Sequence, residues 1–179
     1  MITNCKLGNK QAQFALYEMY CKGMYNVAFR ILNDSFEAED AMQEAFLSCF
    51  TKMESYKGEV AFGAWLKKIV INKSLTNLKR NESRKTTKIE SVAYKLAEED
   101  EKDYGIGSDE TNEKVKVIVN AIQSLKENYR VALNLSLFEG YDNEEIAEIL
   151  GISDENCRTT LSRAKGKLRS ILSTLSLAH

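Results

Sequence analysis

Residues 142–171 read DNEEIAEILGISDENCRTTLSRAKGKLRSI, and this stretch decides how the C-terminal half of the chain folds. Asp142 and Glu145 have the spacing of a capping box, which predicts that a helix begins there. Gly151 can take the left-handed conformation that ends a helix, and Ser153 is a good cap for the next one. Two short helices joined by a turn that contains glycine are typical of a helix-turn-helix.

The two predicted helices each have one apolar face, and they differ in charge. The inward positions are Ile146, Ile149 and Leu150 in the first helix and Cys157, Leu161, Ala164, Leu168 and Ile171 in the second. Every charged residue from 139 to 155 is acidic, whereas every charged residue from 158 to 169 is basic. A basic second helix favours a recognition helix in the major groove of DNA. An ordinary helical hairpin with a solvated basic face is the alternative that this stretch alone leaves open.

Charge and apolar content divide the 179 residues into two outer parts and a middle segment. Bases exceed acids in residues 1–80, acids exceed bases in residues 81–112, and the two balance in residues 113–179. Apolar residues also thin out in the middle segment. We therefore predict two small helical domains, residues 1–84 and 113–179, joined by a flexible acidic linker, residues 85–112. Apolar spacing predicts two more helices in the second domain, about residues 115–125 and 127–138, which makes it a four-helix domain.

The composition excludes several classes of protein. Proline is absent and glycine occurs only 9 times, which indicates an all-α fold. The net charge is −1, so affinity for nucleic acid would have to come from local basic patches. No apolar run has the length of a membrane span, and the N-terminus lacks a signal-peptide core, so we expect no membrane insertion and a cytoplasmic location.

The cysteines and the single histidine argue against a metal centre. Cys5, Cys21, Cys49 and Cys157 are far apart and form no CxxC pair, which favours reduced thiols over disulfides or a zinc site. The only histidine is the last residue, His179, which argues against a histidine-based catalytic triad. The chain also lacks a phosphate-binding glycine loop, so an enzyme is poorly supported and we expect no metal and no cofactor.

The first domain is predicted to begin with residues 10–32, as one helix or as two that break at Gly23. The apolar residues expected in its core are Phe14, Leu16, Tyr17, Tyr20, Val27, Ala28, Phe29, Ile31 and Leu32. Asp34 and Glu37 predict the start of the next helix. Its inward side is Ala38, Met42, Phe46, Cys49, Phe50 and Met53. Its outward side carries Asp40, Gln43, Glu44 and Leu47, a face that suits docking on a partner helix, although a solvated face with one exposed leucine is equally compatible.

A loop at residues 55–59 precedes a longer helix at about residues 62–84. The helix is expected to bury Phe62, Trp65, Leu66, Ile69, Leu75 and Leu78. Its exposed side is expected to carry Lys68, Asn72, Lys73, Thr76, Asn77, Lys79 and Arg80. Amides and hydroxyls among cations can bond to bases as well as neutralise phosphates, and the aromatic loop could hold an unstacked base. This is a second candidate patch for nucleic acid.

The chain as a whole resembles the extracytoplasmic-function (ECF) sigma factors of bacterial RNA polymerase. EAEDAMQEAFLSCF (37–50) is similar to the polymerase-docking segment of that family, and SYKGEVAFGAWLKKIVINKSLTNLKR (55–80) to its promoter-melting segment. LKENYRVALNLSLFEGYDNEEIAEILGISDENCRTTLSRAKGKLR (125–169) is similar to the domain that reads the upstream promoter element. Three such blocks in this order carry the resemblance.

The resemblance implies a role for each matching position. On the β′ clamp helices of core RNA polymerase would sit Asp40, Gln43, Glu44 and Leu47. A base of the downstream promoter element would be held by the loop at residues 56–62, with Tyr56, Lys57 and Phe62. The same strand would be read or held by Asn72, Lys73, Asn77 and Arg80. The upstream element would be contacted by Arg158, Thr159, Ser162 and Arg163, with Lys165 and Lys167 near phosphates. The β flap of the polymerase, promoter DNA and an anti-sigma factor are the other implied partners, and the linker would run toward the RNA exit path.

The sequence departs from the family pattern at three positions. Lys126 stands where proline is usual, Cys157 where valine is usual, and Thr160 where a second basic residue is common. The Thr160 departure leaves one DNA contact in doubt. The main alternative to a sigma factor is a self-sufficient helix-turn-helix regulator that binds paired half-sites as a dimer.

Overall fold

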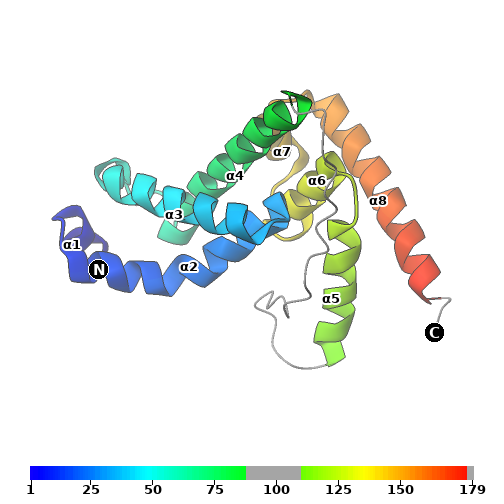
Figure 1. Cartoon of the computed structure of the whole chain (residues 1–179). Helices are drawn as coiled ribbons and strands as arrows, with labels where there is room; N and C mark the ends of the chain where they lie inside the picture. Colours follow the sequence, from blue (N-terminus) through cyan, green and yellow to red (C-terminus); the bar gives the residue numbers. More distant parts are fainter. Residues whose placement is uncertain (88–109, 177–179) are drawn as a thin grey trace. The chain divides into compact units, whose positions relative to one another are not determined.

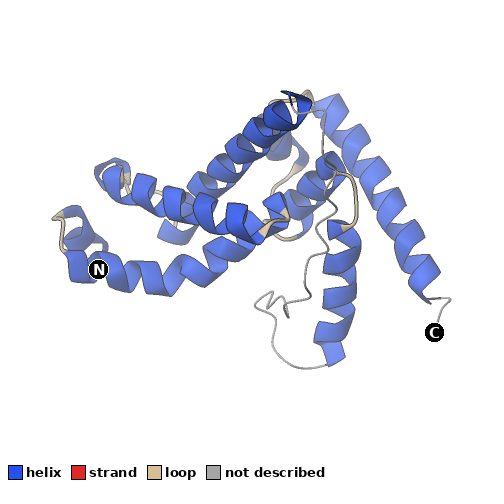
Figure 2. Ribbon diagram, viewed as in Figure 1, coloured by secondary structure: helices blue, strands red, loops and turns tan. Residues whose placement is uncertain are grey.

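The computed structural model describes residues 1–87 and 110–176, and every regular element in these residues is a helix (Figures 1 and 2). This confirms the all-α fold class. The chain separates into two compact units, Met1–Gly105 and Ile106–His179. Residues 85–87 and 110–112, which were included in the predicted linker, lie at the ends of helices. Its remaining residues, 88–109, lie outside the described part, and the limits of the linker stay a prediction.

The first unit consists of α1 (Ile2–Lys6), α2 (Lys10–Leu32), α3 (Ser35–Thr51), the short 3-10 helix η1 (Met53–Ser55) and α4 (Phe62–Thr87). The helices α2, α3 and α4 pack against one another, and α1 packs on α2 and η1. Ile31, Leu66 and Ile71 are among its fully buried side chains. This three-helix core holds the outer faces of α3 and α4 in fixed positions.

Local hydrogen bonds explain where α2 and α3 begin. Asn9 Oδ1 accepts from the backbone N–H of Ala12 at 3.0 Å, and Asp34 Oδ1 accepts from the N–H of Glu37 at 3.0 Å. Asn33 lies between the two helices with a φ of 56°, in the left-handed region that asparagine tolerates better than most residues. The predicted helix start at Asp34 is therefore confirmed.

The structure decides one open alternative for α2 and corrects one expectation. Of the two arrangements expected for residues 10–32, the single helix is the one observed, and it is continuous through Gly23, although glycine costs about 1 kcal/mol relative to alanine inside a helix. Its neighbours Met24, Val27 and Ala28 are buried against the core, and this packing offsets the weak propensity. Phe14 was expected in the core but is 61% exposed, so it lies on a side of α2 that no described helix covers.

The second unit consists of α5 (Glu110–Gln123), α6 (Glu127–Leu137), α7 (Asn143–Leu150) and α8 (Asp154–Ser176), which confirms the four-helix arrangement. The helix α8 packs against α5, α6 and α7. Ile122, Leu133, Leu135 and Ile146 are fully buried at its centre. The core of this unit holds α8 by one side only.

The helices α7 and α8 have the capping that their sequence predicts. Asp142 Oδ1 accepts from the N–H of Glu145 at 2.9 Å, and Glu145 Oε2 accepts from the N–H of Asp142 at 2.9 Å. Gly151 ends α7 with a φ of 68°, in the left-handed region. Ser153 Oγ accepts from the N–H of Asn156 at 3.2 Å, which caps α8. The helix-turn-helix is thus defined by contacts within a few residues of the turn.

Candidate nucleic-acid and polymerase interfaces

The helix α8 separates an apolar side from a polar side. Cys157, Leu161, Ala164 and Leu168 are buried, at spacings of three and four residues. All six residues predicted to meet the upstream element are exposed: Arg158, Thr159, Ser162, Arg163, Lys165 and Lys167. Residues 158, 159, 162 and 163 share one face because they are spaced by one turn. Within the described part of the chain, none of the six side chains makes a hydrogen bond or an ion pair to another side chain.

Thr160 is turned away from this exposed face. Its side chain is half-buried, and its hydroxyl donates to Asn156 Oδ1 at 3.3 Å, one turn earlier in α8. A long cation at this position could reach outward, whereas threonine satisfies its hydroxyl within the helix. Thr160 therefore adds no positive charge to the exposed face of α8 at the position where the family pattern commonly has a basic residue.

The helix α3 presents the predicted docking face to solvent. Asp40, Gln43 and Leu47 are exposed, with Leu47 at 68%, and Glu44 is half-exposed. The opposite side of α3 is lined by Ala38, Ala41 and Ala45, all fully buried. These small residues let α3 lie close to its neighbours, so the outward face is carried on a rigid support.

Sequence reasoning missed Phe36 on the same side of α3. Phe36 is 79% exposed and precedes Asp40 by one helical turn. Its position four residues before Asp40, on the same side of the predicted helix, is the sequence signal that would have identified it. Phe36 adds a second exposed apolar side chain to the predicted docking face that contains Leu47.

The loop after η1 stands on a cluster of aromatic rings. The Tyr56 ring lies 5.5 Å from the Phe62 ring and 5.2 Å from the Trp65 ring, measured between centroids. Tyr56 and Phe62 are only 9% and 5% exposed. These two rings therefore lie beneath the loop, and in this structure they offer no open surface on which a base could stack. The exposed loop residues are 57–61, including Lys57.

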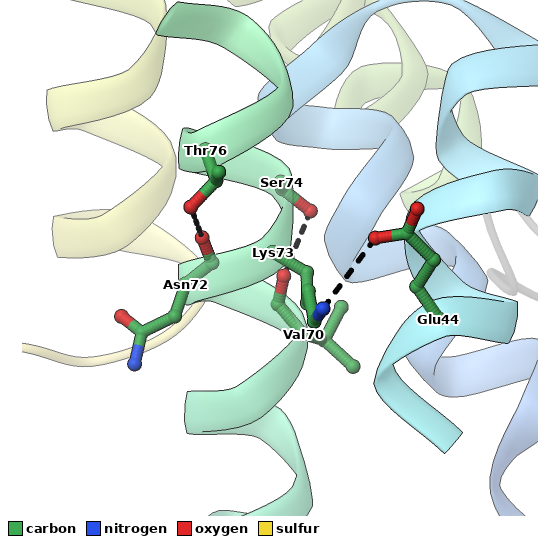
Figure 3. Close-up of polar contacts among 6 residues, drawn as sticks. All are labelled: Glu44, Val70, Asn72, Lys73, Ser74 and Thr76. Atoms are coloured by element: carbon green, nitrogen blue, oxygen red, sulfur yellow. Dashed lines mark hydrogen bonds and ion pairs between the residues drawn. The ribbon is translucent and has the colours of Figure 1, made fainter. Parts of the chain in front are cut away.

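Asn72 and Arg80 on α4 are exposed as expected, and Lys73 is half-exposed. Figure 3 shows Asn72 and Lys73. Lys73 Nζ lies 3.5 Å from Glu44 Oε2 on α3, so a predicted DNA contact is paired with a predicted docking residue. Figure 3 shows the amide of Asn72 pointing away from this pair, which leaves the amide open to a ligand.

The prediction that Asn77 is exposed was wrong. Asn77 is 2% exposed, and among the described residues its Nδ2 has no hydrogen-bond partner. It belongs to a buried stripe of α4 with Leu66, Val70 and Ser74, which are also fully buried. The spacing of seven residues from Val70 to Asn77 was the signal that sequence reasoning missed, because it counted Asn77 with its polar neighbours. Asn77 is therefore part of the packing of α4 and not of its outer face.

Comparisons with known proteins identify both units. Residues 16–84 match the family model described as Sigma-70 region 2, and residues 116–168 match the model described as Sigma-70, region 4. The chain is 28% identical to the RNA polymerase sigma-H factor of Pseudomonas aeruginosa, over 98% of this chain and 93% of that protein. It is 25% identical to the ECF RNA polymerase sigma factor SigM of Mycobacterium tuberculosis, over 94% of this chain and 81% of that protein.

The chain belongs to the ECF sigma factors. Its fold is also that of known sigma factors. The structure of RpoE from Bartonella quintana, solved with the anti-sigma factor NepR, superposes with a TM-score of 0.58 and 21% identity, covering 89% of this chain and 95% of that one. The structure of CnrH with the cytosolic domain of CnrY gives a TM-score of 0.55 and 17% identity, covering 97% and 95% of the two chains.

The two family matches place the faces described above within this sigma factor. The region 2 match contains α3, the loop and most of α4, and the region 4 match contains α6, α7 and the basic part of α8. The helix α1 precedes the region 2 match. The match of the first unit to region 2 disfavours the alternative of a dimeric regulator with an unrelated first domain.

Three thiols of this sigma factor, those of Cys5, Cys49 and Cys157, are buried packing groups. Burial raises the pKa of Cys49 to about 12, and it also raises the pKa of Cys5 and of Cys157. These thiols are therefore protonated at neutral pH and behave as small apolar groups, as expected for Cys157. Over residues 1–87 and 110–176 no cluster of metal-ligating side chains occurs, and no helix is both long and apolar enough to cross a bilayer.

Proposed function

We propose that this sigma factor binds core RNA polymerase and directs it to promoters by reading two DNA elements, one with each unit. The observation that carries the proposal is α8, where all six predicted contacts are exposed while the apolar stripe is buried. A helix so divided can enter the major groove without disturbing its own unit.

The upstream element is assigned to α8. Arg158 and Arg163 carry guanidinium groups that can bond to both acceptors of a guanine edge, and Thr159 and Ser162 can bond to bases or phosphates. Lys165 and Lys167 lie further along the helix and are assigned to phosphates, which set the register of the helix in the groove.

The downstream element is assigned to residues 57–61 and to the outer side of α4. Asn72 is the side chain best placed to read a base, because its amide is exposed and points outward (Figure 3). Lys57, Lys73 and Arg80 supply cations for the strand. Tyr56 and Phe62 support the loop from below and are not assigned a direct contact.

Docking on the polymerase is assigned to α3, through Asp40, Gln43, Glu44 and Leu47, with the clamp helices of the β′ subunit as the partner. The second unit is assigned to the β flap. Acids and an amide around an exposed leucine can bond to basic side chains of a partner helix while the leucine is buried at the contact.

The regulatory partner and the working environment follow from the same assignment. RpoE and CnrH were each solved with a bound partner protein, and we propose that an anti-sigma factor likewise holds this chain inactive. We place the chain in the cytoplasm, where core polymerase works. It carries out no chemistry of its own, and the polymerase supplies the catalysis.

The proposal is tested by measuring oligomeric state and DNA binding with and without core polymerase. A sigma factor is expected to be a monomer that binds duplex DNA weakly alone and forms a sequence-specific complex with core enzyme. A stable dimer that binds an operator tightly without polymerase would overturn the proposal in favour of the regulator.

A further inference from the structure

The helix α1 is attached to the first unit by several contacts, although it lies before the region 2 match. Cys5 is 2% exposed, and its backbone carbonyl accepts from Gln13 Nε2 on α2 at 3.4 Å. The helix also packs on η1, which leads directly into the loop at residues 57–61. The N-terminal residues are therefore in reach of the loop that is assigned to DNA.

Lys6, the last residue of α1, makes the contact that joins α1 to this loop. Lys6 Nζ donates to the backbone carbonyl of Tyr56 at 2.8 Å, across 50 residues of sequence. The bond is partly buried, and its donor is charged, so it is stronger than a neutral bond in the same position. Tyr56 is the residue at which η1 ends and the exposed loop begins.

Tyr56 also holds the far end of the loop. Its hydroxyl donates to the backbone carbonyl of Val60 at 2.7 Å, and its ring packs on Phe62 and Trp65. Between these two points Gly58 turns the chain with a φ of 80°. The backbone of Tyr56 and the side chain of Tyr56 therefore fix the two ends of one short loop.

We propose that Lys6 is a positioning residue for the DNA-contacting loop, residues 57–61. By holding the carbonyl of Tyr56, Lys6 sets the direction in which the loop leaves η1. The hydroxyl of Tyr56, bonded to the carbonyl of Val60, then fixes the other end of the loop. Lys6 acts on base recognition through Tyr56 and makes no DNA contact itself. The inference rests on the proposed function, because it assumes that the loop meets the downstream element.

The test compares Lys6→Met, Lys6→Arg and a matched control, Lys10→Met, in reconstituted holoenzyme. Lys10 is exposed at the start of α2, and its substitution removes the same charge near the N-terminus. Transcription from a library with random upstream and downstream elements is sequenced for each variant. We expect Lys6→Met to lower base preference at the downstream element by about fivefold and to leave the upstream preference unchanged. Lys6→Arg should restore most of the preference, and Lys10→Met should match the wild type.

A second readout needs no DNA. Trp65 is the only tryptophan and its ring lies against Tyr56, so its fluorescence reports the cluster in the isolated chain. Lys6→Met should change the Trp65 emission, and Lys10→Met should not.

Three outcomes would overturn the role of Lys6. These are an unchanged downstream preference in Lys6→Met, an equal loss at both elements, or the same loss in Lys10→Met. If the wild type itself selects no promoter, the proposed function fails instead, and the fluorescence result still decides whether Lys6 orders the loop.

Discussion

The two surfaces assigned to DNA differ in how far they are tied to the rest of their unit. On α8 the contact residues are exposed and unpaired among the described residues, and the four buried positions form one narrow stripe. On the first unit, Lys73 is paired with Glu44, and Tyr56 and Phe62 are buried beneath the loop. The buried residues of α8 form a single apolar stripe, which leaves its polar side to a ligand, whereas the buried residues of α4 include the polar Ser74 and Asn77.

The difference teaches that exposure on α8 follows directly from periodicity, but exposure on α4 depends on which helices cover it. The helix α4 packs on α2 and α3, and the residues that it buries include the polar Ser74 and Asn77. The ion pair between Lys73 and Glu44 also joins the docking face to the DNA face. Substitutions in the first unit are therefore expected to combine binding effects with stability effects, and those on α8 are not.

The largest effect is expected on the docking face, from Asp40→Arg combined with Glu44→Arg. The variant places two cations where acids would meet the polymerase, and we expect its affinity for core enzyme to fall by about a thousandfold. Co-purification with core polymerase measures the loss. The control, Glu18→Arg with Glu54→Arg, makes the same charge change at other exposed positions. Equal retention of core enzyme by both double variants would show that α3 is not the docking helix.

The next largest effect is expected from substitutions of Asn77, which distinguish a role in packing from a role in DNA contact. Asn77→Asp puts a charge at a site that is 2% exposed, and we expect it to reduce the free energy of unfolding by about 3 kcal/mol. Asn77→Leu removes the amide that lacks a partner and keeps a similar volume, so the protein should fold and keep its promoter preference. Urea unfolding and transcription measure the two quantities. If the Asn77→Leu protein is stable but loses the downstream preference, Asn77 contacts DNA and is not only a packing residue.

These contrasts show what the sequence could and could not predict. The helix starts at Asp34, Asp142 and Ser153 were predicted correctly, because each depends on hydrogen bonds within three residues. The burial of Asn77 and the exposure of Phe14 depend on which helices lie alongside, and a residue's own type does not reveal this.

The candidate sites follow the same rule. The exposed residues of α8 could be predicted from one amphipathic pattern, because only one side of the helix is covered. The contact of Lys6 with Tyr56 joins residues that are 50 positions apart, so no local sequence pattern predicts it. Long-range contacts of this kind arise from the packing of whole helices.

A moderate effect is expected on α8 from Arg158→Ala. Loss of a bidentate contact to a base should weaken binding of the upstream element by about 2 kcal/mol and relax preference at one position. The unfolding free energy should not change, because Arg158 is exposed and unpaired within the described residues. Arg169→Ala removes the same side chain three turns later and serves as the control. An equal loss on every upstream sequence would make Arg158 a phosphate contact.

The smallest effect is expected from Lys73→Met, which breaks the pair with Glu44. The two side chains are 37% and 44% exposed, so solvent screens them and the loss of stability should be about 0.5 kcal/mol. It should shrink as salt is raised. A double-mutant cycle with Glu44→Gln, measured by urea unfolding at low and high salt, isolates the pair. A coupling energy of zero at low salt would show that the ion pair does not contribute to the stability of the first unit.

The most direct measurement is transcription in vitro by core polymerase and this sigma factor on a library of random promoters, with the active templates sequenced. The account predicts active templates with two separate conserved elements, of which Arg158→Ala alters only the upstream one and Asn72→Ala only the downstream one. Active templates with a single element, or one variant that alters both elements alike, would contradict the assignment of one DNA surface to each unit.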